Sequence, residues 1–121
     1  RTMTENVLVI LSCGTDNPNR ATRALFIAMV AAKKGKNTAL FLLDEAVLIA
    51  KRGIATHIKA ATGDSADDHL VFLQEFNVPI LVCTPCAESR QITEADLVKG
   101  AQMVTGAELI DLACKSTVIS L

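Results

Sequence analysis

Three runs of apolar residues constrain the fold of this chain more than any other feature. Residues 7–11, 38–43 and 80–83 are almost continuously apolar instead of alternating between apolar and polar. Short continuous runs, the first of them followed by Gly14, are typical of parallel strands that are covered on both faces. The sequence therefore predicts a buried parallel sheet between two layers of helices.

Helical segments separate these strands and carry recognisable start and stop residues. Asn17 followed by Pro18 predicts the beginning of a long helix over 21–34, which Gly35 ends. A shorter helical stretch is expected from Asp44 to Arg52.

Later in the chain, a hydroxyl and a carboxylate three residues apart predict three more helix starts. These capping boxes are Ser65 with Asp68, Thr93 with Asp96, and Thr105 with Glu108. Leu70, Leu73 and Phe76 fall on one face of the helix that follows the first box. With short strands at 102–104 and 117–121, we expect a single three-layer α/β/α domain with a mostly parallel, about five-stranded sheet.

Composition excludes several classes of protein. A chain of 121 residues, half of them hydrophobic, suits one domain over 1–121 with its own core. We expect residues 1–5 to be disordered or partly derived from cloning. A net charge of −1, with no Trp or Tyr, offers neither a basic surface nor stacking platforms for nucleic acid.

The sequence also predicts a cytoplasmic protein without a membrane partner. Its longest apolar run, 24–32, is far shorter than the roughly 18 residues that a membrane span needs. The first residues lack the pattern of a signal peptide. In a reducing compartment, reactive or metal-binding thiols are favoured over structural disulfides.

The same run predicts an unusual packing of the first helix. Residues 24–32 are apolar nearly all round, whereas a helix with one wet face shows a polar stripe. We expect something besides the sheet to cover this helix, and we predict a homo-oligomer on that ground.

Ligands of open α/β sheets bind beyond the carboxyl ends of the strands, which narrows the search for a site. The segments there are 12–17, 44–47 and 83–90. The candidates that they supply for lining a pocket are Cys13, Thr15, Asp16, Asn17, Asp44, Thr84 and Arg90.

Cys83-Thr84-Pro85-Cys86 is the sharpest local motif. It places one thiol at the end of a strand and another at the start of a predicted helix, capped by Thr84 with Pro85 in its first turn. Helix N-termini and CxxC pairs lower cysteine pKa values, so a reactive thiolate is expected, with Arg90 helping and Glu88 opposing. The alternative for Cys83 is a small apolar residue that completes a buried strand.

Other chemistries find less support in the sequence. Zinc needs about four ligands, and one CxxC supplies two; Cys13, His57, His69 and Cys114 form no second close pair. Cys13 and Cys114 are expected in the core, although Cys13 would approach Cys83 if the first and third strands paired. His69 is expected to be solvated, and His57 is a weak pocket candidate. Neither a dinucleotide-binding nor a Walker pattern is present.

Segments 15–18, 41–47 and 82–90, with Gly35 before the second strand, together resemble the DsrE/DsrF-like family. The resemblance implies a small α/β protein that forms homotrimers, hexamers or mixed complexes and carries sulfur as a cysteine persulfide. Cys83 matches the sulfur-carrying cysteine of the DsrE and TusD branch of the family. Cys86 matches a cysteine that is found in other branches. The chain departs from the carrier branch at Pro85, at its second nearby thiol and at Gln91, where an Arg-Gly step is common.

The leading hypothesis is a sulfur-handling protein in which Cys83 bears the persulfide and Cys86 assists or resolves it. No cofactor is required, and the partners would be proteins that donate and accept sulfur. One alternative is an oligomeric ligand-binding or scaffold protein. Another is a thiol-disulfide oxidoreductase that cycles between Cys83 and Cys86.

Overall fold

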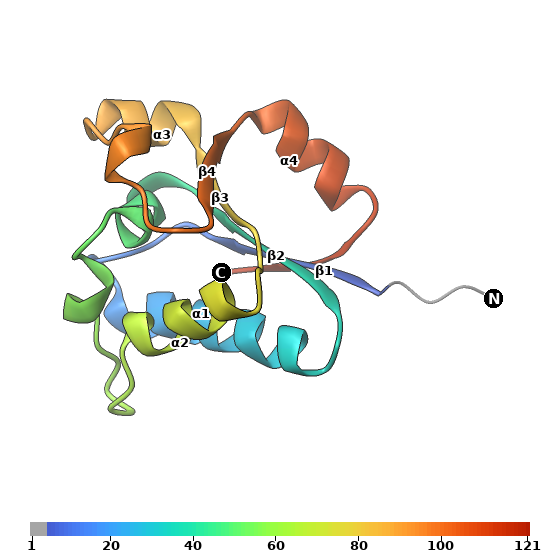
Figure 1. Cartoon of the computed structure of the whole chain (residues 1–121), viewed down its shortest axis with the longest axis horizontal. Coiled ribbons are helices and arrows are strands. Elements are labelled where there is room, and N and C mark those ends of the chain that lie inside the picture. Colours follow the sequence, from blue (N-terminus) through green and yellow to red (C-terminus); the bar gives the residue numbers. More distant parts are fainter. Residues whose placement is uncertain (1–4) are drawn as a thin grey trace.

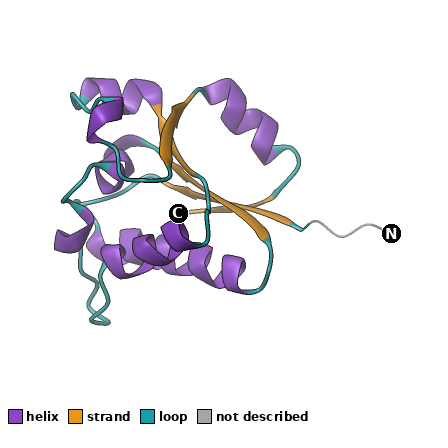
Figure 2. Ribbon diagram, viewed as in Figure 1, coloured by secondary structure: helices purple, strands orange, loops and turns teal. Residues whose placement is uncertain are grey.

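The computed structural model describes residues 5–121 as a five-stranded, all-parallel sheet with helices on both faces (Figures 1 and 2). The strands are β1 (Asn6–Leu11), β2 (Asn37–Leu42), β3 (Ile80–Cys83), β4 (Ala101–Val104) and β5 (Thr117–Ser120). The helices are α1 (Pro18–Lys33), α2 (Ala66–Glu75), α3 (Thr84–Ser89) and α4 (Gly106–Ala113). Three short 3₁₀ helices are η1 (Asp44–Ala50), η2 (Ala55–His57) and η3 (Glu94–Asp96). The predicted α/β class is confirmed.

The strand order is β4-β3-β2-β1-β5, so β1 pairs with β2 and β5. The three strands predicted from continuous apolar runs occupy the centre of the sheet, where both of their faces are covered. Helices α1 and α2 lie on one face and α4 on the other (Figure 1). On the α4 face, a small core forms around Leu8, Phe41, Leu81 and Val104.

The helix starts predicted from Asn17 and from the three capping boxes are present because each depends on contacts between residues three apart. The Asn17 side chain accepts from the Arg20 N–H at 3.2 Å and caps α1. The three predicted capping boxes are formed at α2, η3 and α4. Helix α1 begins at Pro18 with Asn17 as its N-cap, as the Asn17-Pro18 pair predicts.

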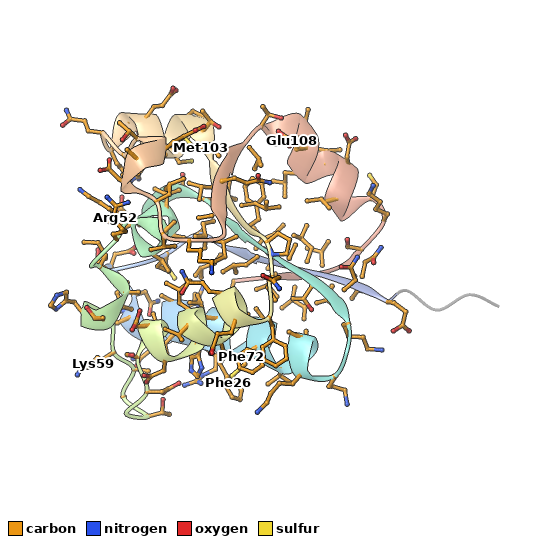
Figure 3. All side chains as sticks on the ribbon, in the orientation of Figure 1. Phe26, Arg52, Lys59, Phe72, Met103 and Glu108 are labelled. Carbon is orange, nitrogen blue, oxygen red and sulfur yellow. The ribbon has the colours of Figure 1, made fainter. Side chains whose placement is uncertain are left out.

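Helix α2 supplies the additional cover that the apolar first helix requires. It packs along α1, and Phe26 and Phe72 lie in this layer (Figure 3). Of the three residues predicted on one face of this helix, Leu70 and Leu73 are buried. Phe76, the C-cap residue, is 57% exposed and stacks on Phe72 with ring centroids 4.0 Å apart. Because α1 is largely covered within the chain, its composition by itself no longer argues for an oligomer.

His69 was expected to be solvated and is instead buried, with 8% of its surface exposed. Its ring packs edge-on against Phe26, and its Nε2 lies 2.6 Å from Asp64 Oδ2. Hydrogen bonds from the Thr62 hydroxyl and from His69 lower the pKa of Asp64 to about 2. His69 therefore anchors the 59–65 loop on the α1–α2 layer.

One further expectation is corrected at the end of a helix. Cys114 is exposed, not in the core, because it follows the last residue of the half-covered helix α4. Glu5 is the first described residue: its carbonyl accepts from the Asn37 N–H at 2.9 Å, and its carboxylate pairs with Lys36. Residues 1–4 lie outside the described residues. None of the helices within 5–121 has the length and hydropathy of a membrane span.

Candidate functional site at the end of strand β3

Cys83 and Cys86 face each other at the junction of β3 and α3. Their Sγ atoms are 2.7 Å apart, and both residues are half-buried. The helix begins one residue earlier than predicted, so Cys83 takes the N-cap position and Thr84 and Pro85 form the first turn. The Thr84 hydroxyl donates to the Val104 carbonyl at 2.7 Å, which fixes the start of α3 to β4.

The electrostatics of Cys83 differ from the expected activation. Burial raises the pKa of the Cys83 thiol, and the adjacent Cys86 thiol and the Asp44 charge raise it further. A backbone hydrogen bond from Cys86 in the first turn of α3 lowers this pKa by less than burial raises it, so the expected net lowering is wrong for Cys83. At neutral pH, Cys83 is therefore mainly a thiol.

Arg90 forms an ion pair with a carboxylate and remains within electrostatic range of Cys86 and Asp44. Its Nε and Nη2 donate to Glu45 Oε1 at 2.9 and 2.6 Å, and its Nη1 donates to the Cys86 carbonyl at 3.1 Å. Glu45 lies on η1, 45 residues earlier, so this ion pair joins η1 to α3. Sequence spacing contained no signal for this pair.

Asp44 is the predicted pocket residue that the fold brings to the thiols. Its Oδ1 lies 3.8 Å from Cys86 Sγ. The residue follows β2 in a left-handed backbone conformation, with a φ of 49°. This conformation is uncommon for residues other than glycine, although aspartate and asparagine adopt it more readily than most.

The segment after β1 does not join the thiol pair. Because β2 lies between β1 and β3 in the sheet, Cys13 is not beside Cys83. The Cys13 thiol is buried and lies 3.9 Å from the Asn17 carbonyl oxygen. Burial raises the pKa of this thiol. Asp16 accepts from the Gly14 N–H at 2.8 Å, and Asn17 caps α1. These contacts give Asp16 and Asn17 local structural roles, while Thr15 is exposed and unassigned.

A hollow of about 410 Å³ lies on the β4 side of α3. Its lining residues are Thr84, Glu88, Ile92, Thr93, Glu94 and Met103, the last of which is labelled in Figure 3. Thr84 lines this hollow, whereas the two cysteines are not part of its lining. His57 is exposed on η2, and no group of three potential metal ligands is found among residues 5–121.

Gly14 supports the site in a way that sequence analysis missed. A Cβ atom at this position would overlap the backbone carbonyl oxygen of Glu45 at the start of η1. The absence of a side chain therefore lets the β1–α1 loop and η1 approach closely. A glycine directly after a predicted strand was the only available signal.

We expect Gly14→Ala to destabilise the protein by about 1–3 kcal/mol, because backbone atoms must move to admit the methyl group. Urea denaturation measures the change. Gly106→Ala is the matched control: a Cβ there meets nothing within 4 Å, and the residue opens α4, so we expect little change. Equal midpoints for the two variants would contradict the close approach.

These features define a class of small α/β proteins with an all-parallel sheet and a thiol pair at the carboxyl end of a central strand. The model of the DsrE/DsrF-like family matches residues 5–121, nearly the whole chain. The chain therefore belongs to the DsrE/DsrF-like family.

Relatives with curated sequences add no assigned activity. An uncharacterised protein of Methanocaldococcus jannaschii is 30% identical over 105 residues, covering 84% of this chain and 86% of its own. An uncharacterised protein of Methanopyrus kandleri is 25% identical over 108 residues, covering 87% of this chain and 84% of its own.

Solved structures share the fold. The ychN protein from E. coli has a TM-score of 0.80 at 24% identity, covering 98% of this chain and all of its own. The protein BT1422 of unknown function from Bacteroides thetaiotaomicron has a TM-score of 0.66 at 16% identity, with full coverage of both chains. At these identities the likeness is one of fold.

Proposed function

We propose that this protein handles sulfane sulfur, carried as a persulfide on Cys83. The observation that carries the proposal is the pair of facing thiols at the end of β3 in a chain of the DsrE/DsrF-like family. In the first step, the Cys83 thiolate attacks the outer sulfur of a donor persulfide, R–S–SH. The donor S–S bond breaks, R–SH leaves, and Cys83–S–SH forms.

The stored sulfur then has two routes. A thiol on an acceptor protein can attack the outer sulfur and take it, which restores the Cys83 thiol. Alternatively, Cys86 attacks the inner sulfur, which forms a Cys83–Cys86 disulfide and releases hydrogen sulfide. The second route oxidises both cysteines, so an external dithiol must reduce them before another cycle.

A thiol-disulfide oxidoreductase is the second candidate, because the 2.7 Å approach of the two Sγ atoms also suits a reversible disulfide. We propose that the protein works in the cytoplasm, a reducing compartment in which thiols such as the four cysteines stay free. Both candidate functions fit that compartment.

The experiment that separates these candidates is the intact mass of the reduced protein after incubation with a small organic persulfide. Gain of one sulfur atom supports the carrier. Loss of two hydrogens without added sulfur fits both candidates, because resolution by Cys86 also ends in a Cys83–Cys86 disulfide. The same incubation of Cys86→Ser then separates them: gain of one sulfur atom supports the carrier, and a mixed disulfide with the organic group R supports the oxidoreductase. An unchanged mass would favour a ligand-binding or scaffold role.

We also propose a homo-oligomer, a trimer or hexamer as the family resemblance implies. Large apolar side chains remain exposed on both helical layers. They are Val30 on α1, Val71 on α2, Phe76 directly after α2, and Ile110 on α4. Sedimentation velocity at micromolar concentration should give a single species heavier than the 12.9 kDa chain. A soluble monomer would overturn this proposal.

A further inference from the structure

The charges around the thiol pair are not balanced. Glu45 and Arg90 neutralise each other through two hydrogen bonds. Asp44, whose Oδ1 is 3.8 Å from Cys86 Sγ, has no ion-pair partner within residues 5–121. Two carboxylates and one guanidinium leave one net negative charge beside the thiols. The nearest further carboxylate in sequence, Glu88 on α3, is exposed and lines the hollow on the β4 side.

We infer that Asp44 is a specificity-determining residue that disfavours anionic sulfur donors and selects donors without net negative charge. This assignment of a donor class rests on the proposed sulfur-handling function. Its physical basis is the repulsion between the Asp44 carboxylate and a negatively charged compound that approaches Cys83 or Cys86. Two unit charges of the same sign about 4 Å apart in a water-like medium repel each other by about 1 kcal/mol. Such a repulsion slows the reaction of an anionic compound about fivefold.

The same carboxylate also affects the thiols themselves. Its charge disfavours a second negative charge nearby, in agreement with the raised pKa of Cys83. The reaction rate of a neutral reagent depends on the effect of Asp44 on thiolate formation alone. An anionic reagent reports both thiolate formation and the repulsion of the approaching molecule, so the ratio of the two rates isolates the repulsion.

Asp44→Asn removes the charge with little other disturbance. Asparagine has nearly the same shape as aspartate and also tolerates the left-handed conformation found here, with its φ of 49°. Glu88→Gln is the matched control, because it changes the net charge of the protein by the same amount from an exposed position on α3.

The test compares alkylation by iodoacetate and by iodoacetamide. Both react by the same step: the thiolate attacks carbon, a C–S bond forms, and iodide leaves. We would follow the peptide that carries Cys83 and Cys86 by mass spectrometry. Asp44→Asn should raise the iodoacetate-to-iodoacetamide rate ratio about fivefold at low salt, and added salt should reduce this difference. Glu88→Gln should leave the ratio nearly unchanged.

Thiosulfate then tests the donor class. It transfers its outer sulfur to a thiolate and leaves as sulfite. Normalised to the iodoacetamide rate of each variant, sulfur loading from thiosulfate should rise at least fivefold in Asp44→Asn, because thiosulfate carries two negative charges. An alkylation ratio that is the same in wild type and Asp44→Asn, or that rises equally in Glu88→Gln, would overturn the inference.

The two proposals fail in different ways. If the alkylation ratio shifts but neither thiosulfate nor a small organic persulfide loads sulfur, the proposed function fails while the action of Asp44 on approaching anions stands. If sulfur loads on wild type and Asp44→Asn at equal normalised rates and the alkylation ratio is constant, the inference about Asp44 fails and the proposed function stands.

Discussion

Cys83→Ser is expected to abolish the gain of sulfur from a persulfide donor. A serine hydroxyl does not ionise near neutral pH, so it cannot replace the thiolate that attacks the donor. Cys86→Ser should still gain one sulfur atom and should keep it longer, because the thiol 2.7 Å away that resolves the persulfide has been removed. Intact mass over time measures both effects.

Cys114→Ser is the control for this experiment, because it removes an exposed thiol at the end of α4, outside the Cys83–Cys86 pair. It should load sulfur at Cys83 as wild type does. The raised pKa of Cys83 adds a pH dependence: loading should accelerate as the pH rises above neutral, because the thiolate fraction grows. Full loading of Cys83→Ser at another cysteine would refute the assignment.

Phe41→Ala is expected to have the largest effect on stability. Phe41 is 1% exposed and lies in the core of the α4 face with Leu8, Leu81 and Val104. Truncating a buried phenylalanine costs about 3–5 kcal/mol, out of a total of roughly 5–15 kcal/mol for a typical domain. Helix α4 has no fully buried residue of its own, so its attachment depends on this core.

Urea denaturation, followed by circular dichroism, measures the loss. Phe76→Ala is the matched control, since the same atoms are removed from a side chain that is 57% exposed and contacts Phe72 by stacking. We expect a change below about 1 kcal/mol there. If both phenylalanine variants lost the same stability, the assignment of the α4-face core would be wrong.

Much of the local structure was predictable because its causes are local. A capping box requires two residues three apart, and Ser65 with Asp68 forms one wherever the helix lies. A strand buried on both faces must be apolar throughout, as in residues 80–83, which form β3 with those boundaries. The rule that sites lie beyond the carboxyl ends of parallel strands selected both the segment 44–47, which contains Asp44, and the segment 83–90, which contains Cys86.

The errors lie where burial depends on a distant element. Cys114 was expected in the core, yet α4 leaves it exposed, and His69 was expected in solvent, yet Phe26 and Asp64 cover it. Periodicity states which side chains share a face, but it does not state what packs against that face. Asp67 and Asp68 beside His69 indicated solvent, whereas a loop closes over the ring.

The sequence alone determined the α/β class, the starts of the helices that carry side-chain caps and the thiol pair at the end of a strand, because these follow from contacts within a few residues. Tertiary structure decided the order of the strands, and with it that Cys13 is separated from Cys83 by β2. It also decided that Arg90 pairs with Glu45 and that Asp44 is left facing Cys86. Those contacts join residues more than forty positions apart, and only the packing of η1 against α3 brings them together.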